Sequence, residues 1–135
     1  MQLSHGLVVA VVDGEVLNLY ANNGDERSLK LTALDPVSLS GDNKSSGSRH
    51  QSSSSNPDES RQEEDSFAAA VAAYLNGEVL SGRIASLFII AAPKTLGELR
   101  LHYHKSLEAK LAGELAKDLT GHSIADIEAA LVRAA

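Results

Sequence analysis

Cysteine and tryptophan are absent from this chain of 135 residues, and aromatic residues make up only 4% of it. Without cysteine, the chain can form neither disulfide bonds nor thiolate metal sites, and it has no cysteine nucleophile. With two phenylalanines and three tyrosines, a core must be built mainly from leucine, valine, isoleucine and alanine. A chain of this length buries roughly two thirds of its unfolded surface around one core. We therefore expect residues 1–135 to form a single domain.

Long hydrophobic runs and an excess of basic residues are also missing. The apolar stretch near the start, Leu7 to Val12, is far shorter than a membrane span, and neither a basic region nor a small-residue cleavage site accompanies it. These features predict a cytoplasmic protein that does not associate with membranes. The formal net charge of −6 disfavours sequence-independent binding to nucleic acid, for which lysine and arginine supply most of the affinity. Residues 94–117 are the least acidic part of the chain, so a local basic patch is compatible with the sequence.

Turn signals divide the first part of the chain into strands. Asp13-Gly14 and Asn22-Asn23-Gly24 each lie between β-rich segments, a pattern typical of hairpins. The segment Leu7 to Val12 is apolar at every position, which predicts a central strand covered on both faces. Alternating residues predict a second strand around 16–20 and a third over 28–33, the latter at a sheet edge.

Helical patterns dominate the chain after residue 56. Asn56 and Pro57 are typical of a helix start, and we expect this helix to end near Gly77 or Gly82. The apolar stripe of the helix consists of Phe67, Val71, Tyr74 and Leu75. The segment "ASLFIIAA" predicts a buried strand. Pro93 then begins a second helix, which carries the stripe Leu96, Leu99, Tyr103 and Leu107. Ser123 and Asp126 predict the start of a last helix, which carries the stripe Ile124, Ile127 and Leu131 and ends near Arg133.

The segment 109–119 fits either a helix or a strand. Leu111, Leu115 and Leu119 are four positions apart and are expected to share a face in both structures. Propensity favours a helix, whereas Gly113 and the economy of the chain favour a fifth strand. With a strand here, the order β-β-β-α-β-α-β-α predicts an α/β, RNase H-like three-layer sandwich around a mixed five-stranded sheet. With a helix, the sheet would have four strands.

Catalytic and metal-binding motifs are weak in this sequence. A two-metal nuclease needs converging carboxylates, but the first strand offers only Asp13 in its turn, and residues 63–65 fit a solvated helical face. His102 and His104 are two positions apart and would point to nearly opposite sides of a helix, so they do not form a metal pair. We expect no catalytic residue, no metal and no cofactor.

A helix start after the buried strand is the one position suited to an anion. Lys94-Thr95 lies where free backbone N–H groups attract phosphate, although "FIIAAPKT" lacks the upstream glycines of a nucleotide loop. Plain helix initiation is the favoured interpretation, and an incidental phosphate contact is the alternative.

A family resemblance adds to these patterns. The stretch from "LFIIAAPKTLGELR" to "ADIEAAL" resembles the C-terminal half of the bacterial host-attachment protein family, with a strand ending in Ala-Pro and another closing on Lys117-Asp118-Leu119-Thr120. The likeness continues through Asn56-Pro-Asp-Glu and back to "AVVDGEV" at 10–16. That family is similar to the middle domain of archaeo-eukaryotic peptide-chain release factors, which has an RNase H-like core. The resemblance implies that 109–119 is a strand.

The serine-rich loop at 36–56 is predicted to be a flexible, disordered surface segment before the first helix. In release factors, a Gly-Gly-Gln tip lies in the corresponding loop. Here "SSGSRHQSS" contains Gln51 without the glycine pair, which argues against hydrolysis of peptidyl-tRNA. A loop of this length is also a candidate partner-binding arm.

Together these observations predict a non-catalytic binding module that acts at the ribosome or on structured RNA, or that binds an unknown protein, with an indirect role in host attachment. The alternative is a hydrolase of peptidyl-tRNA or nucleic acid that uses the 40–56 loop or acids near Asp13 and Glu64. No oligomeric state is predicted. The predicted binding residues are Arg49, His50, Gln51, Lys94, Thr95, Lys117 and Asp118.

Overall fold

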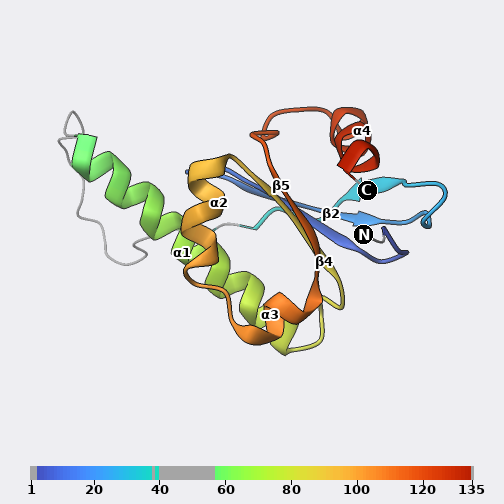
Figure 1. Ribbon diagram of the computed structural model, residues 1–135, viewed down its shortest axis with the longest axis horizontal. Coiled ribbons are helices and arrows are strands. Elements are labelled where there is room, and N and C mark those ends of the chain that lie inside the picture. Colours follow the sequence, from blue (N-terminus) through green and yellow to red (C-terminus); the bar gives the residue numbers. More distant parts are fainter. Residues whose placement is uncertain (1–2, 38, 40–56, 135) are drawn as a thin grey trace.

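A mixed sheet covered by helices on both faces forms the centre of the protein (Figure 1). The computed structural model describes residues 3–37, 39 and 57–134. The strands are β1 (Val8–Val12), β2 (Leu17–Asn22), β3 (Leu31–Ala33), β4 (Leu87–Ala91) and β5 (Leu111–Ala116). The helices are α1 (Pro57–Leu80), α2 (Pro93–Arg100), α3 (Lys105–Lys110) and α4 (Ile124–Ala134). No helix in the described ranges is both long and apolar enough to cross a membrane.

The five strands lie in the order β3-β2-β1-β4-β5. The first three form two antiparallel hairpins, and β1, β4 and β5 run parallel. This arrangement confirms the predicted α/β class and mixed five-stranded sheet. It also confirms that the first strand is central and that the third lies at an edge. Because β1, β4 and β5 run the same way, their ends meet at one side of the sheet, which we call the carboxyl edge (residues 13–14, 92–95 and 117–120).

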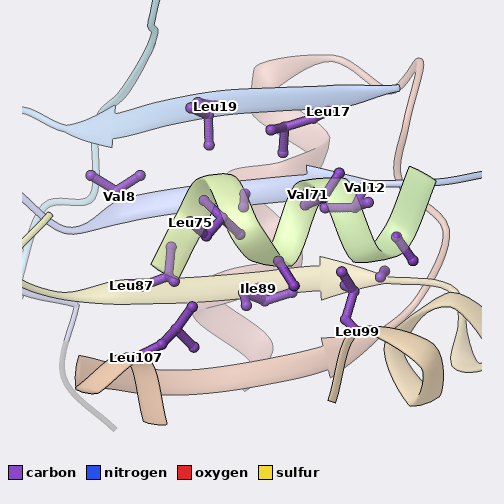
Figure 2. Close-up of a cluster of buried hydrophobic side chains, with 14 of the residues drawn as sticks. Val8, Val12, Leu17, Leu19, Val71, Leu75, Leu87, Ile89, Leu99 and Leu107 are labelled. Carbon is purple, nitrogen blue, oxygen red and sulfur yellow. The ribbon is translucent and has the colours of Figure 1, made fainter. Parts of the chain in front are cut away.

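Two aliphatic clusters hold the layers together. On one face, α1, α2 and α3 cover side chains that β1, β2 and β4 direct toward α1, and Leu75 of α1 packs in the same cluster as Ile89 of β4 (Figure 2). On the other face, Ile127 and Leu131 of α4 pack in a cluster with Phe88 of β4. All residues of β1 and β4 are buried. Burial of each such valine, leucine, isoleucine or phenylalanine contributes roughly 1.5–3 kcal/mol, so these two strands anchor the sheet.

The prediction of one continuous second helix is wrong. α2 ends at Arg100 and α3 begins at Lys105. The side chain of Asn76 on α1 replaces helical hydrogen bonds here, because its Nδ2 donates to the carbonyl of His102 (3.0 Å) and its Oδ1 accepts from the His104 N–H (2.9 Å). His104 therefore lies in the connection and caps α3, its Nδ1 accepting from the Ser106 N–H.

The segment 109–119 contains a strand, but a shorter one than predicted. Residues 109–110 belong to α3, and β5 ends at Ala116. The expectation that the leucines share a face is also wrong. Leu111 packs in the cluster with α1, whereas Leu115 and Leu119 pack in the cluster with α4. The reason is a register shift between the pairs Leu87–Leu111 and Phe88–Gly113. Because of this shift, residues 113–116 of β5 lie on the opposite face of the sheet from the one that strict alternation after Leu111 predicts.

The predicted helix starts are confirmed where the structure describes them. Pro57 is the first residue of α1, which continues past Gly77 to Leu80. Ser123 caps α4, because its Oγ accepts from the Asp126 N–H at 3.1 Å. The flexible loop was predicted over 36–56, and residues 38 and 40–56 of it lie outside the described residues. The predicted binding residues Arg49, His50 and Gln51 lie there too.

Candidate functional site

The carboxyl edge is where polar side chains from distant parts of the chain come together. Val12 pairs with Ala91, and Ala91 pairs with Ala116, so β1, β4 and β5 end side by side. Open α/β sheets bind ligands in this position, outside the carboxyl ends of parallel strands. The edge therefore provides the best-placed candidate site among the described residues.

Asp13 shapes the turn that follows β1. Its Oδ1 accepts hydrogen bonds from the N–H groups of Glu15 (2.7 Å) and Val16 (2.6 Å). Its own N–H donates to the Val16 carbonyl at 3.0 Å. An aspartate that bonds to the backbone two and three residues ahead is a common way to close a tight turn. One carboxylate oxygen of Asp13 is thus committed to the backbone, and Oδ2 faces the rest of the edge.

Thr120 connects this turn to the segment that follows β5. Its Oγ1 lies 3.0 Å from Oδ2 of Asp13 and 2.7 Å from Oδ1 of Asp118. A hydroxyl carries one hydrogen, so Thr120 donates to one of these carboxylates at a time. The Thr120 N–H also donates to Oδ1 of Asp118, at 3.2 Å. The hydroxyl, the backbone N–H and the nearby His122 hold the pKa of Asp118 below its usual value, the hydroxyl having the largest effect.

Glu64 reaches the same turn from α1. A Cβ atom at Gly14 would lie only 2.8 Å from Cγ of Glu64, so glycine here lets the Glu64 side chain lie close over the turn. Oε1 of Glu64 is 4.0 Å from Nζ of Lys94. Both of these side chains are largely exposed, so the ion pair is weak.

Lys94 and Thr95 occupy the first turn of α2, directly after β4. The cap residue is Ala92, which has no side chain that could bond to the first N–H groups. Helical bonding begins with the N–H of Leu96, which donates to the Ala92 carbonyl. Thr95 is half-buried and Lys94 is exposed, so this helix start presents a positive charge to solvent.

The structure thus brings Lys94, Thr95, Lys117 and Asp118 to one edge of the sheet. Lys117 and Asp118 are exposed and follow β5 directly. Sequence reasoning did not assign a role to Thr120. The sequence pattern that could have indicated this role is the spacing of Asp118 and Thr120, which are two positions apart, as is typical of an aspartate turn.

Metal-binding geometry is not found in the part of the chain that the structure describes. No group of three or more histidine, aspartate or glutamate side chains there could hold an ion. His102 lies 3.4 Å from Glu98 through its Nε2, and His104 caps α3. The two histidines therefore have separate local partners.

Comparison with known families identifies a release-factor family. The family model described as bacterial archaeo-eukaryotic release factor family 12 matches residues 7–131. The resemblance to release factors is thereby confirmed over nearly the whole chain, including β1, β4 and β5. The matching family does not carry the host-attachment name. No curated protein matches the chain.

Proposed function

Since the chain belongs to bacterial archaeo-eukaryotic release factor family 12, we propose that it is a non-catalytic binding module that acts in translation, at the ribosome or on structured RNA. Family membership is the observation that carries this proposal, because fold alone does not determine function. In this proposal residues 1–135 act as one domain in the cytoplasm. Any role in attachment to host cells is then indirect.

The carboxyl edge is the proposed contact surface. Lys94 and Lys117 lie at the exits of neighbouring parallel strands, and both side chains are exposed. The N-terminal part of α1 extends beyond the sheet near the same edge (Figure 1). Phe67 is the first described residue of α1 that is buried, so the helical turns just before it are available to a partner. The predicted contacts Arg49, His50 and Gln51 precede α1 in the chain and are proposed to add to this surface.

The charges at the edge favour a limited contact over bulk attraction to phosphate. Asp13, Glu64 and Asp118 offset the two lysines, in keeping with a net charge of −6. Asp13 and Asp118 already bond to Thr120, and Glu64 faces Lys94. The lysines are therefore expected to contact a small number of phosphates in a defined geometry.

Sedimentation with ribosomes over a series of salt concentrations tests this function. We expect binding that weakens as salt rises, with a slope of log affinity against log salt that falls by about 1 for each lysine removed. The variant is Lys94→Ala/Lys117→Ala. The matched control is Arg27→Ala/Lys30→Ala, which removes the same charge at the β2–β3 turn, at the opposite side of the sheet. No binding at low salt, or equal weakening in both variants, would contradict the proposal.

A hydrolase is the second candidate, and one observation favours it. Asp13 and Glu64, both named as possible catalytic acids, meet around the Asp13-Gly14 turn. The bonds that commit Asp13 to its turn argue for a structural role instead. Incubation with Mg²⁺ and labelled RNA or peptidyl-tRNA separates the two functions. Turnover that is lost in both Asp13→Asn and Glu64→Gln would establish the hydrolase and overturn the non-catalytic assignment.

A further inference from the structure

Glu64 lies on the side of α1 that packs against the core. Phe67, Ala68 and Val71 follow it at helical spacing, and all three are buried. Residues at such spacings share one side of a helix. Glu64 itself is exposed and lies about one turn before Phe67. The helix therefore directs this acid toward the carboxyl edge rather than away from the protein.

The Asp13-Gly14 turn leaves room for the Glu64 side chain. A Cβ atom at Gly14 would lie 2.8 Å from Cγ, 3.0 Å from Cδ and 3.1 Å from Oε2 of Glu64. The end of the Glu64 side chain thus lies directly over the backbone of the turn. A side chain at position 14 would push it away, so the glycine allows the carboxylate to reach this part of the edge.

The start of α2 brings Lys94 to the same place. Phe67 of α1 and Leu96 of α2 pack in one cluster, which holds the two helices together. Nζ of Lys94 is 4.0 Å from Oε1 of Glu64, which is longer than a direct hydrogen bond. The first turn of α2 contains no acidic residue. Glu64 therefore supplies, from another helix, the negative charge that favours a helix start.

Glu64 differs from the other two acids of the edge in how it is held. Oδ1 of Asp13 accepts two backbone hydrogen bonds in its turn, and Asp118 accepts from the Thr120 hydroxyl and N–H. Among the described residues, Lys94 is the one cation that pairs with Glu64. The side chains of Lys94 and Glu64 are 61% and 46% exposed, so water screens their attraction. Glu64 is therefore the acid of the edge that a ligand can displace most readily.

We propose that Glu64 limits the attraction of Lys94 for phosphate, as an internal carboxylate that competes with a ligand phosphate for the same ammonium group. This inference rests on the proposed function, in which Lys94 contacts phosphate. A phosphate that approaches Lys94 is repelled by Glu64 and must also replace its attraction for the lysine. Ligands that offer only negative charge are disfavoured in this way, which is one route to a selective contact.

Binding of the full chain to fluorescently labelled polyuridylate at low salt tests the competition. Glu64→Gln keeps the shape of the side chain but removes its charge, and we expect it to lower the Kd about threefold. The gain should vanish when Lys94→Ala is already present, because no ammonium group is then released. Glu63→Gln is the matched control. It removes the same charge from the neighbouring exposed residue of α1, about 100° around the helix, and is expected to change the Kd much less.

The double-variant comparison separates this competition from a general effect of net charge. A Glu64→Gln protein that binds polyuridylate no more tightly than the natural chain would overturn the inference. An equal gain in Glu63→Gln, or a gain that persists beside Lys94→Ala, would overturn it too. These substitutions should leave the circular dichroism spectrum unchanged, which separates altered binding from altered folding.

Failure of the proposed function has a different signature. If the natural chain does not sediment with ribosomes, the function is contradicted, while a Lys94-dependent gain on polyuridylate still supports the role of Glu64. If the chain sediments with ribosomes and that gain is missing, the function stands and the role of Glu64 is rejected.

Discussion

The hydroxyl of Thr120 lies 3.0 Å from Oδ2 of Asp13, so the segment after β5 is joined to the turn after β1. These residues are 107 positions apart in the chain. The contact passes across the end of β4, which lies between β1 and β5. It therefore ties together the ends of the parallel strands at the proposed contact surface.

Replacing Thr120 with valine is expected to loosen this connection. Thr120→Val keeps the size of the side chain but removes the hydroxyl that contacts Asp13 and Asp118. Because the site is partly exposed, we expect a loss of about 1 kcal/mol in the free energy of unfolding, measured by urea titration. Thr120→Ser retains the hydroxyl and serves as the control. Equal losses in the two variants would show that the hydroxyl is not what joins the segments.

Asp118 should titrate below an ordinary aspartate. Its pKa is lowered from 3.8 mainly by the Thr120 hydroxyl, then by the Thr120 N–H and His122. Because the folded-state pKa is the lower one, the stabilisation is fully present above the unfolded-state pKa and is lost as pH falls through the folded-state value. NMR titration of the Asp118 carboxyl carbon measures this directly. In Thr120→Val the pKa should move up, and an unchanged pKa would contradict the assigned cause.

All three tyrosines should resist ionisation in the folded protein. Burial is the largest cause that raises the pKa of Tyr20, Tyr74 and Tyr103 above 10.0, and for Tyr103 the hydrogen bond to Glu114 adds to it. The folded state thus favours the protonated phenols. The resulting stabilisation is complete below the unfolded-state pKa and is lost as pH rises toward the folded-state values.

Near-ultraviolet absorbance of tyrosinate tests this during an alkaline titration. We expect little signal near the ordinary pKa in the native protein and a full signal in urea, with Tyr103 ionising last. Tyr103→Phe should remove the most resistant part of the titration. If all three tyrosines ionised near the ordinary pKa in the native protein, the burial of these rings and the hydrogen bond of Tyr103 to Glu114 would be contradicted.

Two glycines should respond in opposite ways to substitution by alanine. A Cβ at Gly24 would overlap the Ser28 carbonyl oxygen, so Gly24→Ala must displace the backbone of the β2–β3 turn. We expect a loss of about 2–4 kcal/mol. Gly77 is exposed inside α1, and a Cβ there meets nothing within 4 Å. Gly77→Ala should therefore stabilise the protein by about 0.5–1 kcal/mol. Thermal and urea unfolding measure both changes in the free energy of unfolding. A gain in stability for Gly24→Ala would contradict the close approach of the Ser28 carbonyl to Gly24.

The elements that sequence patterns predicted well are those set by local chemistry. Asp13-Gly14 and Asn22-Asn23-Gly24 determine their turns through nearby backbone and side-chain bonds. The uniformly apolar runs in β1 and β4 had to be central because no exposed face could accommodate them. The capping bond of Ser123 likewise spans three residues.

The site was less predictable, because its residues meet only after the chain has folded. Lys94 and Lys117 could be named from the helix start and the family motif, but their place on one edge depends on the parallel order of β1, β4 and β5. The role of Thr120 depends on Asp13, which is far away in sequence. Arg49, His50 and Gln51 remain predictions.

By itself, then, the sequence determined the aliphatic core, the two hairpins and the alternation of strands and helices, since these follow from composition and near neighbours. Only the tertiary structure decided where the second predicted helix breaks and which way the last strand faces. Asn76 of α1 takes the backbone groups between α2 and α3, and the register shift against β4 turns Leu115 away from the side of Leu111. Both outcomes depend on groups brought close by packing, and no periodicity within one segment records them.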